Sequence, residues 1–184
     1  MKKFVRPLIL CAGLAIILSV TSFLLVRAQD TTTITPQQIE YIRGNCISLK
    51  NTLNQTHISD ALLRVNMGQR YELISTKLMN RFNARVGSNN FSNTGLISAY
   101  RNFNTELENF RIDYKSYEEK LSETINIDCV LEPTAFYEAI ILVRIERFQV
   151  YSDIVKLNKY IDEYLSAVNV FENSFKTIIE GLKN

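Results

Sequence analysis

The stretch "LISAYRNFNTELENFRIDYKSYEEKL", residues 96–121, decides the fold of this chain. Large apolar and aromatic side chains recur in it at alternating intervals of four and three residues: Leu96, Tyr100, Phe103, Leu107, Phe110, Tyr114, Tyr117 and Leu121. Because an α-helix has about 3.6 residues per turn, this repeat places all of them on one face. An unbroken repeat of this length is typical of a helix that packs in a coiled-coil-like seam. We therefore predict a helix over about residues 94–126.

Similar repeats lie on both sides of this helix. Residues 134–182 carry one with a single polar exception, Arg147, and their apolar face is broad enough to pack against two helices. Residues 36–86 carry another, with one extra four-residue step. Thr35, Pro36 and Gln38 form a capping-box pattern with a proline at the first helical position, which predicts a helix start there. The seam positions predicted near the end of this helix are Met67, Tyr71, Ile74, Leu78 and Phe82.

The connections between these repeats complete the predicted fold. Glycine, serine and asparagine cluster in residues 86–95, which indicates a turn, and Pro133 begins the last helix. No strand pattern competes with the helical one. We predict an all-α fold, an elongated antiparallel three-helix bundle of coiled-coil-like, up-down-up form. The bundle occupies residues 36–184, with helices over about 36–86, 94–126 and 134–182.

The first residues predict export. Lys2, Lys3 and Arg6 precede an uncharged run over residues 7–26, and Ala28 ends a cleavage pattern. The run is also long enough to span a bilayer as an uncleaved helix. Residues 1–28 are therefore a signal peptide or a membrane anchor, followed by a linker over residues 29–35. Because the positive charges precede the run, both alternatives place the bundle outside the cytoplasm, secreted, periplasmic or anchored.

The net charge does not favour nucleic acid as a partner. The whole chain has a formal charge of +2, but its first 28 residues hold four bases and no acids. The remainder has 17 bases against 19 acids. We therefore expect no binding to nucleic acid.

Two cysteines of the exported region predict a disulfide. The middle helix is shorter than its neighbours, and an extended segment after it would bring Cys129 to the level of Cys46 on the first helix. An oxidising compartment would allow the bond, and the alternative is a pair of free buried thiols. A metal site is poorly supported, because two cysteines and one distant histidine lack ligand spacing.

The residues offer little for catalysis. His57 is the only histidine, and Ser59 and Asp60 near it do not converge with it on one point of a helix. Adjacent acidic residues splay apart on a helix, and the sequence has no glycine-rich phosphate loop. We predict that the protein is not an enzyme and has no cofactor.

Charge and exposed apolar residues suggest two contact surfaces. Residues 36–86 have a net charge of +4 and residues 94–184 a net charge of −5, which favours pairing between the helices. Alternatively, Lys77, Arg81, Arg85 and Arg101 form a basic tip for an anionic cell-wall polymer or lipid. Off the seam of the last helix, Ile141, Leu142, Ile145 and Phe148 form an apolar surface, which we expect where the middle helix is missing. It is a surface for self-association or for a protein partner, unless the segment "NIDCVLEP", residues 126–133, and the N-terminal arm cover it.

One stretch carries a family resemblance. "LNQTHISDALLRVNMGQRYELISTKLMNRF", residues 53–82, resembles exported coiled-coil proteins of reduced-genome bacteria of the candidate phyla. The resemblance implies a bacterial envelope protein and transfers no functional residue. We expect a non-enzymatic structural or interaction protein of the envelope, a coiled-coil scaffold or spacer. The alternative is a client- or ligand-binding helical module, similar to a chaperone or a sensor.

Overall fold

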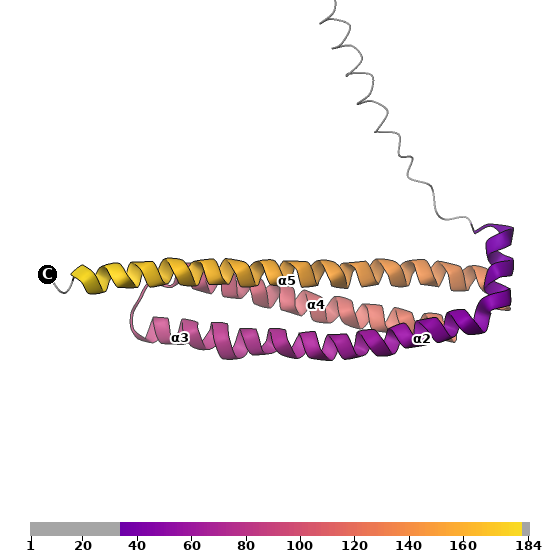
Figure 1. Ribbon diagram of the computed structural model, residues 1–184, viewed down its shortest axis with the longest axis horizontal. Coiled ribbons are helices and arrows are strands. Elements are labelled where there is room, and N and C mark those ends of the chain that lie inside the picture. The colour runs from indigo at the N-terminus through magenta and orange to yellow at the C-terminus, as the bar shows by residue number, and fades with distance from the viewer. Residues whose placement is uncertain (1–33, 182–184) are drawn as a thin grey trace, which may run out of the picture. The chain divides into compact units, whose positions relative to one another are not determined.

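The computed structural model describes residues 34–181, and all regular structure in that range is helical. The elements are α2 (Pro36–Leu73), the π-helical segment η2 (Ile74–Met79), α3 (Asn80–Ser88), α4 (Thr94–Asn126) and α5 (Pro133–Gly181). α2, η2 and α3 follow one another without a break, so the chain forms three packed helical arms (Figure 1). The predicted all-α fold with three packed helices is confirmed for these residues. The predicted signal peptide or anchor, residues 1–28, lies outside the described residues.

Local capping interactions set the helix ends. The Thr35 hydroxyl accepts a hydrogen bond from the Gln38 backbone N–H at 3.3 Å, and the Gln38 side chain accepts one from the Thr35 N–H at 2.8 Å. This is the predicted capping box. At the other end of the arm, Asn90 adopts a left-handed conformation with φ 57°. The Phe91 N–H then bonds to the Val86 carbonyl at 3.2 Å, which ends α3 in a Schellman motif.

α4 and α5 form the best-packed pair of arms. α4 buries ten residues, and seven of the eight seam positions predicted from its repeat are among them. Phe103 and Leu121 are completely buried, as are Phe136 and Leu157 on α5. Because the repeat keeps large side chains on one face for the full helix, the two arms exclude water continuously along α4.

A charged cluster lies in this same α4–α5 interface. Asp153 is fully buried, and its Oδ1 accepts hydrogen bonds from Gln149 at 3.1 Å and from the Lys156 ammonium at 3.2 Å. The Lys156 ammonium also pairs with the buried Glu106 carboxylate at 3.0 Å. Burial, followed by the neighbouring Asp113 carboxyl, raises the pKa of Asp153 to about 6.

The first arm departs from the predicted seam after Tyr71. The buried positions are Ser75, Met79 and Asn83, whereas the predicted seam residue Leu78 is 62% exposed. The reason is η2, because a π-helical turn adds a residue and rotates the following face. The buried polar side chains find partners: the Ser75 hydroxyl bonds to Asn104 at 2.5 Å, and the Tyr164 hydroxyl to Asn83 at 2.7 Å.

The predicted Cys46–Cys129 disulfide is present, with a Cα–Cα distance of 5.6 Å. The path to it differs from the expected extended segment. The Asp128 side chain accepts hydrogen bonds from the Val130 and Leu131 backbone N–H groups, at 2.9 and 3.1 Å, and closes a turn. Figure 1 shows instead that the first turns of α2 bend away from the rest of the helix. The cysteines therefore meet through a bent α2 and a closed turn, and not through an extended segment after the middle helix.

Few of the expected charge pairs join the arms. Arg64 on α2 pairs with Glu118 on α4 at 2.9 Å, in the predicted sense. The pairs Glu72–Arg111 and Asp60–Arg147 run in the opposite sense, with the acid on α2. Complementarity of net charge therefore explains only part of the contact. Within residues 34–181, no helix is both long enough and apolar enough to cross a membrane.

Candidate functional site: a groove between α2 and α5

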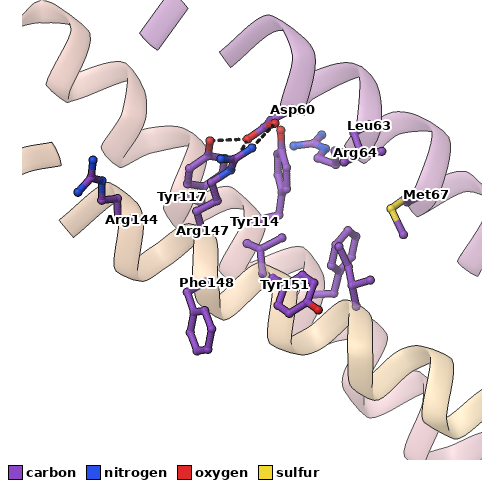
Figure 2. Close-up of a pocket in the computed structure, with 13 residues that line it drawn as sticks. Asp60, Leu63, Arg64, Met67, Tyr114, Tyr117, Arg144, Arg147, Phe148 and Tyr151 are labelled. Atoms are coloured by element: carbon purple, nitrogen blue, oxygen red, sulfur yellow. Dashed lines mark hydrogen bonds and ion pairs between the residues drawn. The ribbon is translucent and has the colours of Figure 1, made fainter. Parts of the chain in front are cut away.

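A groove of about 450 Å³ opens between α2 and α5, with α4 beneath it. Figure 2 shows the side chains that line it. They come from all three arms: Asp60, Leu63, Arg64 and Met67 from α2; Phe110, Tyr114 and Tyr117 from α4; Arg144, Arg147, Phe148, Val150, Tyr151 and Ile154 from α5. The groove forms because α2 packs mainly on α4 and makes little contact with α5.

Aromatic residues of the α4 seam make the floor. Phe110 and Tyr114 lie with ring centroids 6.3 Å apart, and Tyr114 and Tyr117 with centroids 5.9 Å apart in an edge-to-face arrangement. All three side chains are almost fully buried. The floor is therefore rigid and apolar, with phenol groups at fixed positions.

Near one end of the groove is a clamp that takes one residue from each arm. Asp60 on α2 accepts a hydrogen bond from the Tyr117 hydroxyl of α4 at 2.6 Å. The Arg147 guanidinium of α5 contacts both oxygens of the same carboxylate, Nε to Oδ2 at 2.9 Å and Nη2 to Oδ1 at 3.1 Å. Figure 2 shows the three side chains meeting. This set of contacts, which we call the Asp60–Tyr117–Arg147 clamp, joins α2 to α4 and α5, although α2 makes little other contact with α5.

The two tyrosines remain protonated at neutral pH. Burial, and then the Glu118 carboxylate, raises the pKa of Tyr114 to about 12. Burial, and then the hydrogen bond to Asp60, raises the pKa of Tyr117 well above its ordinary value. Both hydroxyls are therefore hydrogen-bond donors, and the buried Tyr114 hydroxyl has no hydrogen-bond partner within residues 34–181.

The groove has an excess of positive charge. Arg64 lies over the Tyr114 ring, with 4.8 Å from its guanidinium carbon to the ring centroid, and pairs with Glu118. Arg144 is exposed and makes no ion pair with any residue of the described range. Three guanidinium groups and one carboxylate thus line the groove, and the carboxylate is already engaged.

The predicted apolar surface lies beside this groove. Leu142, Ile145 and Phe148 are 52%, 59% and 70% exposed, and Ile141 is half-buried. Of these four, Phe148 also lines the groove. The expected position of this surface is wrong, because α4 runs beside this part of α5 and buries Val143 and Val150. The part of α5 beyond the start of α4 is its C-terminal end, past Ala167.

The four residues of the predicted basic tip do not line the groove. Lys77 is in η2, Arg81 and Arg85 are in α3, and Arg101 is in α4. All four side chains are exposed, and none forms an ion pair with a residue between 34 and 181. Their positive charge is therefore open to solvent.

The sequence patterns do not predict the groove, although Arg147, the single polar exception in the α5 repeat, is a signal for it. Its partner Asp60 carries no such signal, because in the sequence it stands out only as a neighbour of His57. In the structure, the His57 Nε2 lies 3.8 Å from Glu118, and the Asp60 oxygens are bonded by Tyr117 and Arg147. No group of three or more metal-ligating side chains is gathered in the part of the chain that the structure describes.

Comparison with known proteins adds no relative. No protein-family model, no curated protein and no solved structure matches this chain.

Proposed function

We propose that this protein is a non-enzymatic structural and interaction protein of the bacterial envelope, which works outside the cytoplasm as a scaffold or spacer. The observation that supports this proposal best is the apolar surface of α5, Ile141, Leu142, Ile145 and Phe148. Three of its four side chains are more than half exposed. Large apolar side chains gathered on one exposed face mark a surface that another molecule covers.

The disulfide supports an extracytoplasmic location. Disulfide bonds persist in oxidising compartments and are rare in the cytosol. The Cys46–Cys129 bond joins residues 83 positions apart, so it constrains most of the bundle. This agrees with export through residues 1–28, as a cleaved or an anchored protein.

Helix length supports the role of a spacer. α5 has 49 residues, which corresponds to roughly 75 Å at about 1.5 Å per residue. In the elongated antiparallel, coiled-coil-like bundle that we propose, such a helix would separate a membrane-proximal end from a distal end. The resemblance of residues 53–82 to exported coiled-coil proteins of candidate-phyla bacteria points in the same direction.

In-cell photocrosslinking tests the proposed surface. A photoreactive residue at Ile145 of the full chain should give one discrete crosslinked product, because this position faces the partner. The same residue at Asn158, an exposed polar position on α5, is the matched control. Equal patterns at both positions, or no product at Ile145, would contradict a partner on this surface.

Sedimentation then distinguishes a second copy from another protein. If the partner is a second copy, the wild-type chain should sediment as a dimer and Ile145→Asp as a monomer. A monomer for both, together with a crosslinked product at Ile145, would identify a different protein as the partner.

A second candidate function is a client- or ligand-binding module, similar to a chaperone or a sensor. The groove between α2 and α5 favours it, because a volume of about 450 Å³ falls in the range of small-molecule sites. An apolar floor with a few polar groups at fixed positions is also typical of such sites.

A further inference from the structure

The lining of the groove changes from charged to apolar along its length. Asp60, Tyr117, Arg144 and Arg147 lie at one end, as Figure 2 shows, and Met67 lies at the other. Phe110 and Ile154 add further apolar surface at the Met67 end. From Arg144 to Ile154 the helix rises roughly 15 Å. A molecule that fits this grading is charged at one end and apolar along the rest.

The charge of the polar end selects an anion. Asp60 is already bound by Tyr117 and Arg147, and Arg64 is bound by Glu118. The Arg144 guanidinium has no such partner within the described range, so its donors are available. A planar guanidinium matches a carboxylate with two parallel hydrogen bonds, which favours this head group over a cation or a neutral alcohol.

The apolar end selects a single chain. Leu63, Phe148 and Tyr151 are 53%, 70% and 61% exposed, so the rims of the groove leave apolar area in water. The floor beneath them consists of buried aromatic rings that cannot move aside. Each methylene that replaces water in such a groove adds to the binding free energy.

We propose that the groove binds one long-chain carboxylate, with its head group on Arg144 and its acyl chain running toward Met67. This inference rests on the second candidate function, the ligand-binding module, and names its ligand class. The groove's volume suits one chain, whereas the two chains of a membrane phospholipid or the side chains of a docking helix need more apolar length.

Calorimetric titration of the full chain with dodecanoate, below its micelle-forming concentration, tests the proposal. We expect saturable binding of one molecule per chain. Arg144→Gln should weaken it about tenfold or more, because a charge-assisted pair is lost. Met67→Gln should weaken it as well, because the apolar end becomes polar. Lys159→Gln removes an exposed base of the same helix outside the groove and should leave the affinity unchanged.

A second ligand tests the head group. Dodecyltrimethylammonium has a similar chain and a cationic head, so it should bind weakly and should not respond to Arg144→Gln. Equal binding of both amphiphiles, or equal affinity of all variants for dodecanoate, would overturn the proposal. Unchanged thermal melting curves of the variants would exclude loss of folding as the cause of a weaker affinity.

These experiments test the ligand class separately from the proposed partner surface on α5. If dodecanoate fails to bind while a photoreactive residue at Tyr151 captures a polypeptide, the ligand class is wrong and the groove is a client site. If dodecanoate binds while Ile145 captures nothing, the ligand class stands and the partner surface on α5 is wrong.

Discussion

α4 and the middle of α2 are both regular helices, but they are held in opposite ways. α4 buries ten of its 33 residues, spread along its whole length. α2 buries three of its 38, and none lies between Cys46 and Tyr71. In that interval Ile58, Leu62 and Leu63 are more than half exposed. α4 is therefore fixed by its core, whereas α2 is fixed at separate points: the disulfide, the Asp60–Tyr117–Arg147 clamp, the partly buried Leu53 and Met67, and the core from Tyr71 onward.

The difference shows how the groove can exist in a small bundle. A helix packed along its full length would fill the space above Tyr114 and Tyr117 with its own side chains. α2 packs on α4 and makes little contact with α5, and the disulfide and the Asp60–Arg147 pair hold it where a core is missing. Core burial is thus concentrated between α4 and α5, whereas the groove opens along the weakly buried middle of α2.

Removing the disulfide should have the largest effect. In Cys46→Ser with Cys129→Ser, we expect the free energy of unfolding to fall by about 4 kcal/mol, because a closed loop spanning 83 positions is released. Urea titration measures the loss. Hydrogen exchange should become faster in α2 before Tyr71 and change little in α4. If hydrogen exchange became faster to the same extent in α2 and α4, the disulfide would not stabilise α2 locally.

Shortening a core side chain of α4 should cost roughly as much. Phe103 is completely buried and lies edge-on against Tyr71, with ring centroids 6.2 Å apart. Phe103→Ala should lower the free energy of unfolding by about 3–4 kcal/mol, through lost burial and a cavity. Urea titration at constant pH measures the change. A loss below about 1 kcal/mol would mean that the α4 seam is looser than its burial indicates.

The buried carboxyl in the α4–α5 interface predicts a dependence on pH. The pKa of Asp153 is about 6 in the folded protein and 3.8 in the unfolded chain. Between these values the folded state binds more protons, so this group stabilises the fold at low pH and that contribution is lost as pH rises toward 7.

Asp153→Asn tests this dependence, because the amide imitates the neutral acid. The free energy of unfolding of the variant should exceed that of the wild type by on the order of 1–2 kcal/mol at pH 7, and the two should be equal near pH 4. Urea titrations at both pH values give the difference. A variant that is less stable than the wild type at pH 7 would show that the Lys156 ion pair outweighs burial.

A substitution in the middle of α2 should have the smallest effect. Leu62 is 63% exposed, so Leu62→Ala should change the free energy of unfolding by less than about 0.5 kcal/mol. The same urea titration serves, with Phe103→Ala as the contrasting variant. A loss of about 2 kcal/mol or more would reveal a contact that covers this face.

The helices and the disulfide could be predicted from the sequence, whereas η2, the bend of α2 and the groove could not. The α4 seam and the Cys46–Cys129 pairing follow from regular spacing and from the few cysteines present. η2 was not predictable, because a π-helical turn adds only one residue, and because the side chains buried in and after it, Ser75 and Asn83, are polar and do not match an apolar repeat. The bend of α2 has no signal in the apolar repeat, and the groove depends on how closely α2 approaches α5, which the repeat does not specify. Arg147 marked the site, but its partner Asp60 is 87 positions away.

The disulfide also decides how the bundle bears a pulling force. Tension applied at residue 35 reaches Cys46 after eleven residues, which extend to roughly 40 Å at most. Beyond that length the load passes through the Cys46–Cys129 bond to the turn between α4 and α5. The rest of α2 then lies outside the line of force, so its weakly buried middle carries none of the load.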